Sequence, residues 1–298
     1  MDNFILIGVF VMLGILLRRI EAFPKETAQT LNMFALYVSL PALILLKAPH
    51  IAFSSDIIVA ALVPWGMLIF SVVLVLLGGR LWDWPRPTIG VLLLVVPLGN
   101  TSFLGVPVIQ AFFGSAGLNH LIVYDQVGTM LIFATYGSII LSLYGRDTTL
   151  DLPTVARKML LFPPSIALVV GLTLSPWFAS EKVVPILQSI ASTLVPMVMT
   201  AIGFQLRLKL PRRLIAPLGF GLVIKLVAAP LVVLWSCRLI GITGLSVDVS
   251  IMEAGMPPMV TAAAMAAIAG MEAELAVALV GVGIVLSFGS LPLLYLML

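Results

Sequence analysis

Apolar stretches of about twenty residues follow one another along nearly the whole chain, with short loops between them. A helix of that length matches the ~30 Å hydrocarbon core of a bilayer. Within hydrocarbon the backbone polar groups have no water to bond, so a spanning segment must satisfy them internally. The sequence therefore predicts an all-α integral membrane protein.

Ten such spans can be delimited by turn residues and charges at their ends. They cover residues 2–19, 28–47, 57–79, 88–112, 119–144, 159–178, 183–205, 213–239, 245–269 and 273–297. The longest polar loop, residues 145–158, follows the fifth span. It divides the chain into a first five-helix repeat at residues 1–144 and a second at residues 159–298.

Composition agrees with a membrane protein, since 61% of the residues are hydrophobic, 10% are charged and the mean hydropathy is +1.19. These values exclude an ordinary soluble domain. A single cysteine, Cys237, excludes a disulfide framework or a cysteine-based metal cluster. The first apolar run has Asp2 before it and arginines after it, the reverse of a signal peptide, so we interpret it as a mature span.

The positive charges predict the orientation. Of the 16 Lys and Arg residues, twelve fall in the loops after spans one, three, five and seven, and three fall in the loops on the other side. We therefore expect the linker 145–158 to be cytoplasmic and both termini to lie outside.

Five spans in each half give the two halves opposite orientations, which permits an inverted repeat. Proline falls in the second and the fourth span of each half. The second spans carry Pro41 and Pro196. In the fourth spans the prolines lie within the interruptions at 97–107 and 255–258. Proline and glycine weaken a helix, and Asn, Thr and Ser compete for its backbone hydrogen bonds. Paired breaks in register predict two discontinuous helices, spans four and nine, that cross at the membrane midplane.

Broken helices expose half-helix ends, and an N-terminal end attracts an anion through its spare N–H groups. We expect the second half-helices to begin near Pro107 and Pro258. The predicted anion site consists of Asn100, Thr101, Ser102, Gly105, Pro107, Gly255, Met256, Pro257 and Pro258. The alternative is that Asn100 and its neighbours only satisfy the freed backbone.

Several of these segments resemble the auxin efflux carrier family of permeases, which includes bacterial carboxylate carriers and plant auxin exporters. GNTSFLGVPVIQAFFG followed by VYDQVGT is similar to the family's fourth and fifth spans, and EAGMPPMVTAAAMAAIAGMEAELA to its ninth. IKLVAAPLVVL, with Lys225 five residues before Pro230, resembles its eighth span.

The resemblance implies a ten-helix fold with two crossed helices and an elevator mechanism. Spans 1, 2, 6 and 7 would form a scaffold, and spans 3–5 and 8–10 would form a mobile transport domain, often within a homodimer. It implies a carboxylate substrate, either a dicarboxylate such as malonate or malate or an aromatic acid such as indole acetate. The implied location is a bacterial cytoplasmic (inner) membrane.

Three ionisable residues lie inside predicted spans, where each costs about 2.5–3.5 kcal/mol and is a functional candidate. Lys225 is near the middle of span eight and needs a carboxylate partner, for which Asp125 and Glu253 are available. Such a pair is either a structural lock or a device for proton coupling. Asp125 is near the outer end of span five, where it could reach water beside an interfacial Tyr124. Glu253 is the better proton or cation candidate.

The sequence carries no catalytic, P-loop or dinucleotide motif, so we expect no enzyme, no cofactor and no resident metal. A secondary carrier of a small organic anion, with proton or sodium as coupling ion and lipid around it, is the favoured interpretation. A sodium-coupled symporter like the bile-acid carriers, a non-transporting organic-anion receptor and an intramembrane enzyme are the alternatives. With no dense basic run, nucleic acid is not an expected partner.

Overall fold

The computed structural model describes residues 2–51, 55–145, 161–205 and 212–298, and every regular element within them is helical. The all-α prediction is therefore confirmed for the described chain. The predicted linker 145–158 lies outside the described residues except for Gly145, as do Arg207 and Lys209 of the expected cytoplasmic charges.

The chain divides into two compact units, and each is built from segments that are far apart in sequence. Unit 1 comprises Met1–Phe53, Ser102–Ile122 and Leu160–Leu206. Its helices are α1 (Asp2–Leu17), α2 (Thr27–Phe34), η1 (Ala35–Ser39), α3 (Leu40–Lys47), η2 (Ala48–His50), most of α6 (Gly105–Val123), α9 (Pro163–Thr173), α10 (Ser175–Phe178), α11 (Val184–Ala191) and α12 (Leu194–Gln205).

Unit 2 comprises Ser54–Thr101, Val123–Met159 and Arg207–Leu298. Its helices are α4 (Ser55–Leu81), α5 (Arg86–Val95), η3 (Tyr124–Met130), η4 (Phe133–Gly137), α7 (Ser138–Tyr144), η5 (Arg212–Leu214), α13 (Ile215–Val223), η6 (Ile224–Ala228), α14 (Ala229–Ile240), α15 (Leu245–Ala254), α16 (Val260–Ile268) and α17 (Ala273–Tyr295).

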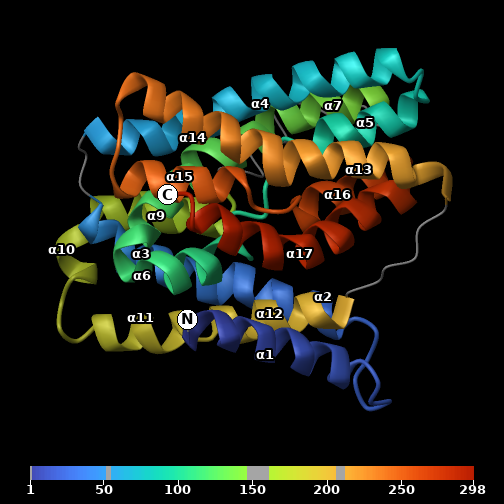
Figure 1. The fold of residues 1–298 in the computed structure, drawn as a ribbon. Helices are drawn as coiled ribbons and strands as arrows, with labels where there is room; N and C mark the ends of the chain where they lie inside the picture. The colour runs from blue at the N-terminus through green and yellow to red at the C-terminus, as the bar shows by residue number, and fades with distance from the viewer. Residues whose placement is uncertain (1, 52–54, 146–160, 206–211) are drawn as a thin grey trace. The chain divides into compact units, whose positions relative to one another are not determined.

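In unit 1, α1 and α12 pack along each other, as the dark blue and yellow helices of Figure 1 show. Two glycines allow this approach. A Cβ added to Gly14 would lie 2.0 Å from the carbonyl oxygen of Thr200, and one added to Gly203 would lie 2.0 Å from that of Val11. Small residues at such crossings are the usual means by which membrane helices approach closely.

Two prolines of the helical segments, Pro41 and Pro230, follow a wide turn. The wide turns η1 and η6 immediately precede the helices that carry Pro41 and Pro230 near their first residues. A π turn reroutes the carbonyl that a proline cannot bond, so the helix continues with little loss. Pro196 was expected in mid-helix, but it lies in the first turn of α12, where its missing N–H is not needed.

Six helical stretches are long and apolar enough to cross a membrane. They are Thr27–His50, Ile57–Leu81, Gly105–Tyr144, Val184–Gln205, Arg212–Ile240 and Ala273–Tyr295. Shorter apolar helices occupy Leu6–Leu17, Arg86–Val95 and Pro163–Thr173. The chain is thus a helical protein with several membrane-spanning segments, and the number ten remains a prediction.

The border expected between spans four and five, residues 113–118, coincides with a break in helix geometry. Gly114 has a φ of 65° and a ψ of −159°, which is not helical, and it separates two helical segments within α6. Glycine reaches this conformation without a Cβ clash, which explains why the break falls there.

Candidate functional site

Two interruptions of helical structure meet in unit 2. α5 ends at Val95, and residues 96–104 are not helical. α15 ends at Ala254, and helical structure resumes only with α16 at Val260. Of the predicted site, Asn100, Thr101 and Ser102 lie in the first interruption, and the four residues 255–258 lie in the second. We refer to residues 98–101 and 255–259 together as the junction.

The backbones of the two interruptions bond to each other. The Asn100 amide donates to the Pro257 carbonyl at 2.7 Å, and the Met259 amide donates to the Leu98 carbonyl at 2.9 Å. These bonds form one isolated antiparallel bridge centred on Gly99 and Pro258. The pairing satisfies backbone groups that the interrupted helices leave free, which a buried segment requires.

The Asn100 side chain is buried, with 3% of its surface exposed, yet its amide nitrogen Nδ2 has no hydrogen-bond partner among the described residues. An unpaired buried donor costs about 1–3 kcal/mol. The backbone bridge is made by the main chain, and the Asn100 Nδ2 group takes no part in it. The Asn100 amide is available to a ligand acceptor.

Asp125 lies beside the junction and is held by two side chains. Thr101 Oγ1 donates to Asp125 Oδ1, and Gln126 Nε2 donates to Asp125 Oδ2 at 2.7 Å. Asp125 is only 2% exposed and Tyr124 only 3%. The expectation that Asp125 reaches water beside an interfacial tyrosine is therefore wrong, because both residues sit on the buried side of η3.

Lys225 comes from η6 and is 2% exposed. Its ammonium nitrogen lies against the junction, since a Cβ added to Gly99 would be 3.1 Å from Lys225 Nζ. The absence of a side chain at position 99 thus makes room for the cation. Lysine stems are flexible, but this one is buried along its length and cannot carry its charge to water.

Glu253, at the end of α15, is fully buried. Neither of its carboxylate oxygens has a hydrogen-bond partner in the described part of the chain. Electrostatic interactions connect it with Lys225, Asp125 and Tyr124. Within the described residues no N···O distance of 4.0 Å or less joins Lys225 to a carboxylate, so the three groups form a charge cluster rather than the direct ion pair that we expected.

The other predicted site residues are not part of this cluster. Ser102, Gly105 and Pro107 belong to unit 1, where Ser102 and Gly105 are buried and Pro107 lines a cavity. Pro107 lies in the first turn of α6, close to its expected place. Pro258 lies two residues before α16 rather than at its start, because the backbone bridge keeps residues 257–259 extended.

Sequence reasoning missed Gln126 and Gly99. Gln126 is a polar residue inside a predicted span and directly follows Asp125. A polar residue in that position is a functional candidate, so the sequence could have indicated it. Gly99 was identified only as a helix breaker. Its contact with Lys225 depends on tertiary structure, and no spacing rule connects residues so far apart in the chain.

Replacing Thr101 with valine removes the hydroxyl that bonds Asp125 while keeping the β-branched shape. We expect the variant to lose about 1–3 kcal/mol of stability, because a buried carboxylate loses a donor. Thermal unfolding of the purified protein measures the loss. Thr101→Ser keeps the hydroxyl and should unfold close to wild type. Equal melting of the valine variant and wild type would show that this hydrogen bond is not stabilising.

Long apolar helices around buried ionisable residues are typical of an integral membrane protein with a functional site inside the membrane. Comparison with known proteins agrees: the sequence model of the membrane transport protein family matches residues 3–295. The chain belongs to this family, the auxin efflux carrier family of permeases.

Two relatives of this chain are also named as transporters. An uncharacterized transporter of Methanothermobacter thermautotrophicus is 28% identical over 295 residues, covering 96% of this chain and 94% of the relative. An uncharacterized transporter of Methanocaldococcus jannaschii is 28% identical over 271 residues, covering 86% of this chain and 85% of the relative.

Proposed function

We propose that this membrane transporter is a secondary carrier of a small organic anion, which binds at the junction in unit 2. The observation that carries the proposal is the buried Asn100 amide without a partner. A carboxylate would accept its hydrogen bond, and the ammonium of Lys225, which lies against the neighbouring residue Gly99, would provide positive charge. A cation in that position would be a poor neighbour for Lys225.

The mechanism that fits this site is alternating access of the elevator type. In it, spans 3–5 and 8–10, which include the junction, carry the anion, and spans 1, 2, 6 and 7 form the scaffold. The ten spans are arranged as a five-plus-five inverted repeat, with spans four and nine broken at the midplane. The backbone bridge supports this, since it joins residues 98–100 to residues 257–259 within unit 2. The same proposal includes a homodimer, both termini on the outside, and location in the inner membrane.

A sodium-coupled symporter is the second candidate, and Glu253 favours it. Two buried carboxylate oxygens without a described hydrogen-bond partner suit a bound sodium ion or a proton. Either ion would offset the excess of carboxylates over Lys225 in the charge cluster. The two couplings differ in what they respond to: sodium dependence of binding favours the symporter, and pH dependence favours proton coupling.

A thermal-shift screen of the purified protein tests the function. Organic acids are added at two pH values, with and without sodium, and the melting temperature is recorded. A ligand that binds only the folded protein stabilises it by mass action, about 2.7 kcal/mol at a concentration of one hundred Kd. We expect one class of carboxylate to raise the melting temperature. A shift with cations or lipids alone would contradict the proposal.

A further inference from the structure

The last turn of α5 ends against a proline. In an α-helix each amide donates to the carbonyl four residues before it. The Val96 amide follows this rule and donates to the Leu92 carbonyl at 3.1 Å. The next amide of the series would belong to residue 97, but Pro97 has no N–H. The Leu93 carbonyl therefore loses its helical donor directly before the junction begins.

Tyr136 supplies the missing donor. Its hydroxyl donates to the Leu93 carbonyl at 3.0 Å, from 43 residues further along the chain. Leu93 is 2% exposed, and a carbonyl in the protein interior needs a partner. Tyr136 belongs to η4, and its neighbour Gly137 lies against α5, since a Cβ added there would be 3.4 Å from Leu94 Cδ1. One hydrogen bond and close packing thus hold η4 against the end of α5 within unit 2.

The turn that Tyr136 completes leads directly into the junction. Leu98 follows Pro97, and its carbonyl accepts from the Met259 amide. Asn100, which bonds Pro257 through its backbone and carries the unpartnered Nδ2 group, comes two residues later. The direction in which α5 ends therefore sets where these groups lie. A hydroxyl that fixes this turn acts on the junction through α5.

We propose that Tyr136 is a positioning residue, which holds the junction in place for its ligand by bonding the carbonyl that Pro97 leaves free. The inference rests on the proposed function, because it assigns a residue that prepares the same site for the anion. The competing role for Tyr136 is a cap that stabilises α5 and leaves the junction unchanged. The two roles differ in what happens at residues 98–100 when the hydroxyl is removed.

Hydrogen exchange of the purified full-length protein in detergent tests the positioning without a ligand. Tyr136→Phe keeps the ring and removes only the hydroxyl. We expect the Asn100 and Met259 amides, which form the backbone bridge, to exchange about three- to tenfold faster, as the loss of one supporting hydrogen bond implies. Faster exchange limited to residues before Pro97, with wild-type exchange at both bridge amides, would overturn the proposal.

Pro97→Ala provides the matched background. Alanine at this position has an amide that can bond the Leu93 carbonyl, so the tyrosine hydroxyl is no longer needed there. We expect Tyr136→Phe to change exchange at the bridge amides by less than twofold in this background. An effect of the same size with and without the proline would show that Tyr136 does not act through the Leu93 carbonyl, which would contradict the proposal.

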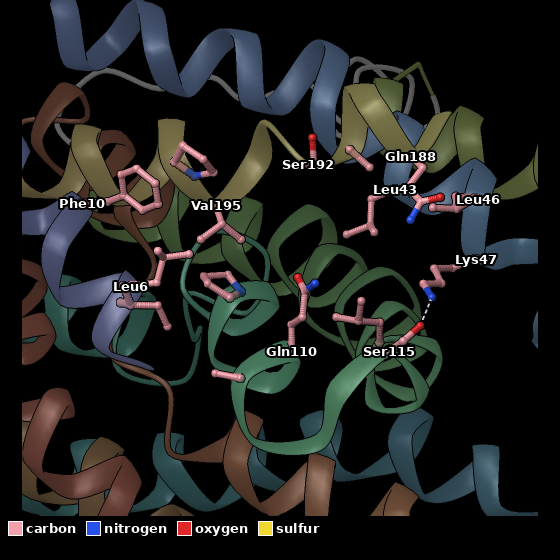
Figure 2. A pocket seen from close by; sticks show the side chains of 16 residues that line it. Leu6, Phe10, Leu43, Leu46, Lys47, Gln110, Ser115, Gln188, Ser192 and Val195 are labelled. Carbon is pink, nitrogen blue, oxygen red and sulfur yellow. Dashed lines mark hydrogen bonds between the residues drawn. The ribbon is translucent and has the colours of Figure 1, made fainter. Parts of the chain in front are cut away.

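Two variants control for the loss of a hydroxyl. Tyr144→Phe changes a second half-buried tyrosine of unit 2. Ser192→Ala removes a hydroxyl that also donates to a backbone carbonyl, three residues before it at 2.7 Å, and that lines the cavity of unit 1 shown in Figure 2. Both should leave the bridge amides within twofold of wild type. Effects as large as that of Tyr136→Phe would indicate a general loss of stability and count against positioning.

Isothermal titration relates the positioning to binding. The probes are malonate, a dicarboxylate, and phenylacetate, an aromatic monocarboxylate. Where the wild type binds an acid, we expect Tyr136→Phe to weaken its Kd about three- to tenfold, and an unchanged Kd would overturn the role of Tyr136.

The two readouts separate the two proposals. If the wild type binds neither acid while the bridge amides respond to Tyr136→Phe, the positioning of the junction is supported and the organic-anion function fails. If an acid binds and the bridge amides of Tyr136→Phe exchange as in wild type, the positioning fails and the proposed function stands.

Discussion

Lys225→Met is expected to abolish organic-anion transport and to destabilise the protein by about 3–5 kcal/mol, the usual cost of removing one charge from a buried set. Lys225 is 2% exposed, and the buried Glu253 interacts electrostatically both with it and with Asp125. Without the ammonium, Glu253 keeps the repulsion of Asp125 and loses the attraction of Lys225. Thermal unfolding and transport into proteoliposomes measure the two effects separately.

The matched control is the double variant Lys225→Met with Glu253→Gln. Removing one charge of each sign restores the balance of the cluster, so we expect the double variant to recover part of the lost stability. A double-mutant cycle should give a coupling energy of about 0.5–3 kcal/mol between the two positions. Strictly additive effects would show that Lys225 and Glu253 do not act on each other. Recovery of stability without transport would show that the two residues act in transport and do not only stabilise the fold.

Asn100→Ala is expected to weaken binding of the transported carboxylate about ten- to a hundredfold, with a smaller effect on folding. The substitution removes the one junction side chain whose buried donor has no described partner, and a hydrogen bond to a charged group contributes about 1.5–3 kcal/mol. Because the Asn100 backbone amide still bonds Pro257, the bridge should persist. Binding is measured by thermal shift with the acid that stabilises the wild type.

Two further variants serve as controls for Asn100→Ala. Asn100→Asp has nearly the same shape but opposes an anion, and we expect it to bind no better than the alanine variant. Asn119→Ala removes an asparagine of unit 1 that donates to the His50 carbonyl at 3.1 Å, and it should bind the acid as wild type does. Unchanged affinity in Asn100→Ala would remove Asn100 from the site.

Much of the helical layout was predictable, because membrane helices are long and apolar and the strongest breakers are clustered. The clusters of Gly, Pro and small polar residues at 97–107 and 255–258 coincide with the non-helical residues 96–104 and 255–259. What could not be predicted is the partner of each break. The bonds between Asn100 and Pro257 and between Met259 and Leu98 join segments over 150 residues apart.

The burial of individual side chains and their contacts across the fold could not be predicted from the sequence. Asp125 was assigned to the outer end of a span from its position along the chain, whereas the wide turn η3 directs it into the protein, where Thr101 and Gln126 bond it. The same limit applies to Gly99 and Lys225. A glycine reads as a helix breaker in sequence, and only the fold shows that the space it leaves holds an ammonium group.

The most direct test of organic-anion transport at the junction is solute counterflow in proteoliposomes. Vesicles containing the purified protein are loaded with an unlabelled organic acid that stabilises it, and entry of the labelled acid is followed for wild type, Asn100→Ala and Asn119→Ala. We expect transient accumulation of label with wild type and Asn119→Ala and none above empty vesicles with Asn100→Ala. Equal accumulation in all three proteins would place the path elsewhere, and no accumulation with the wild type would contradict carboxylate transport.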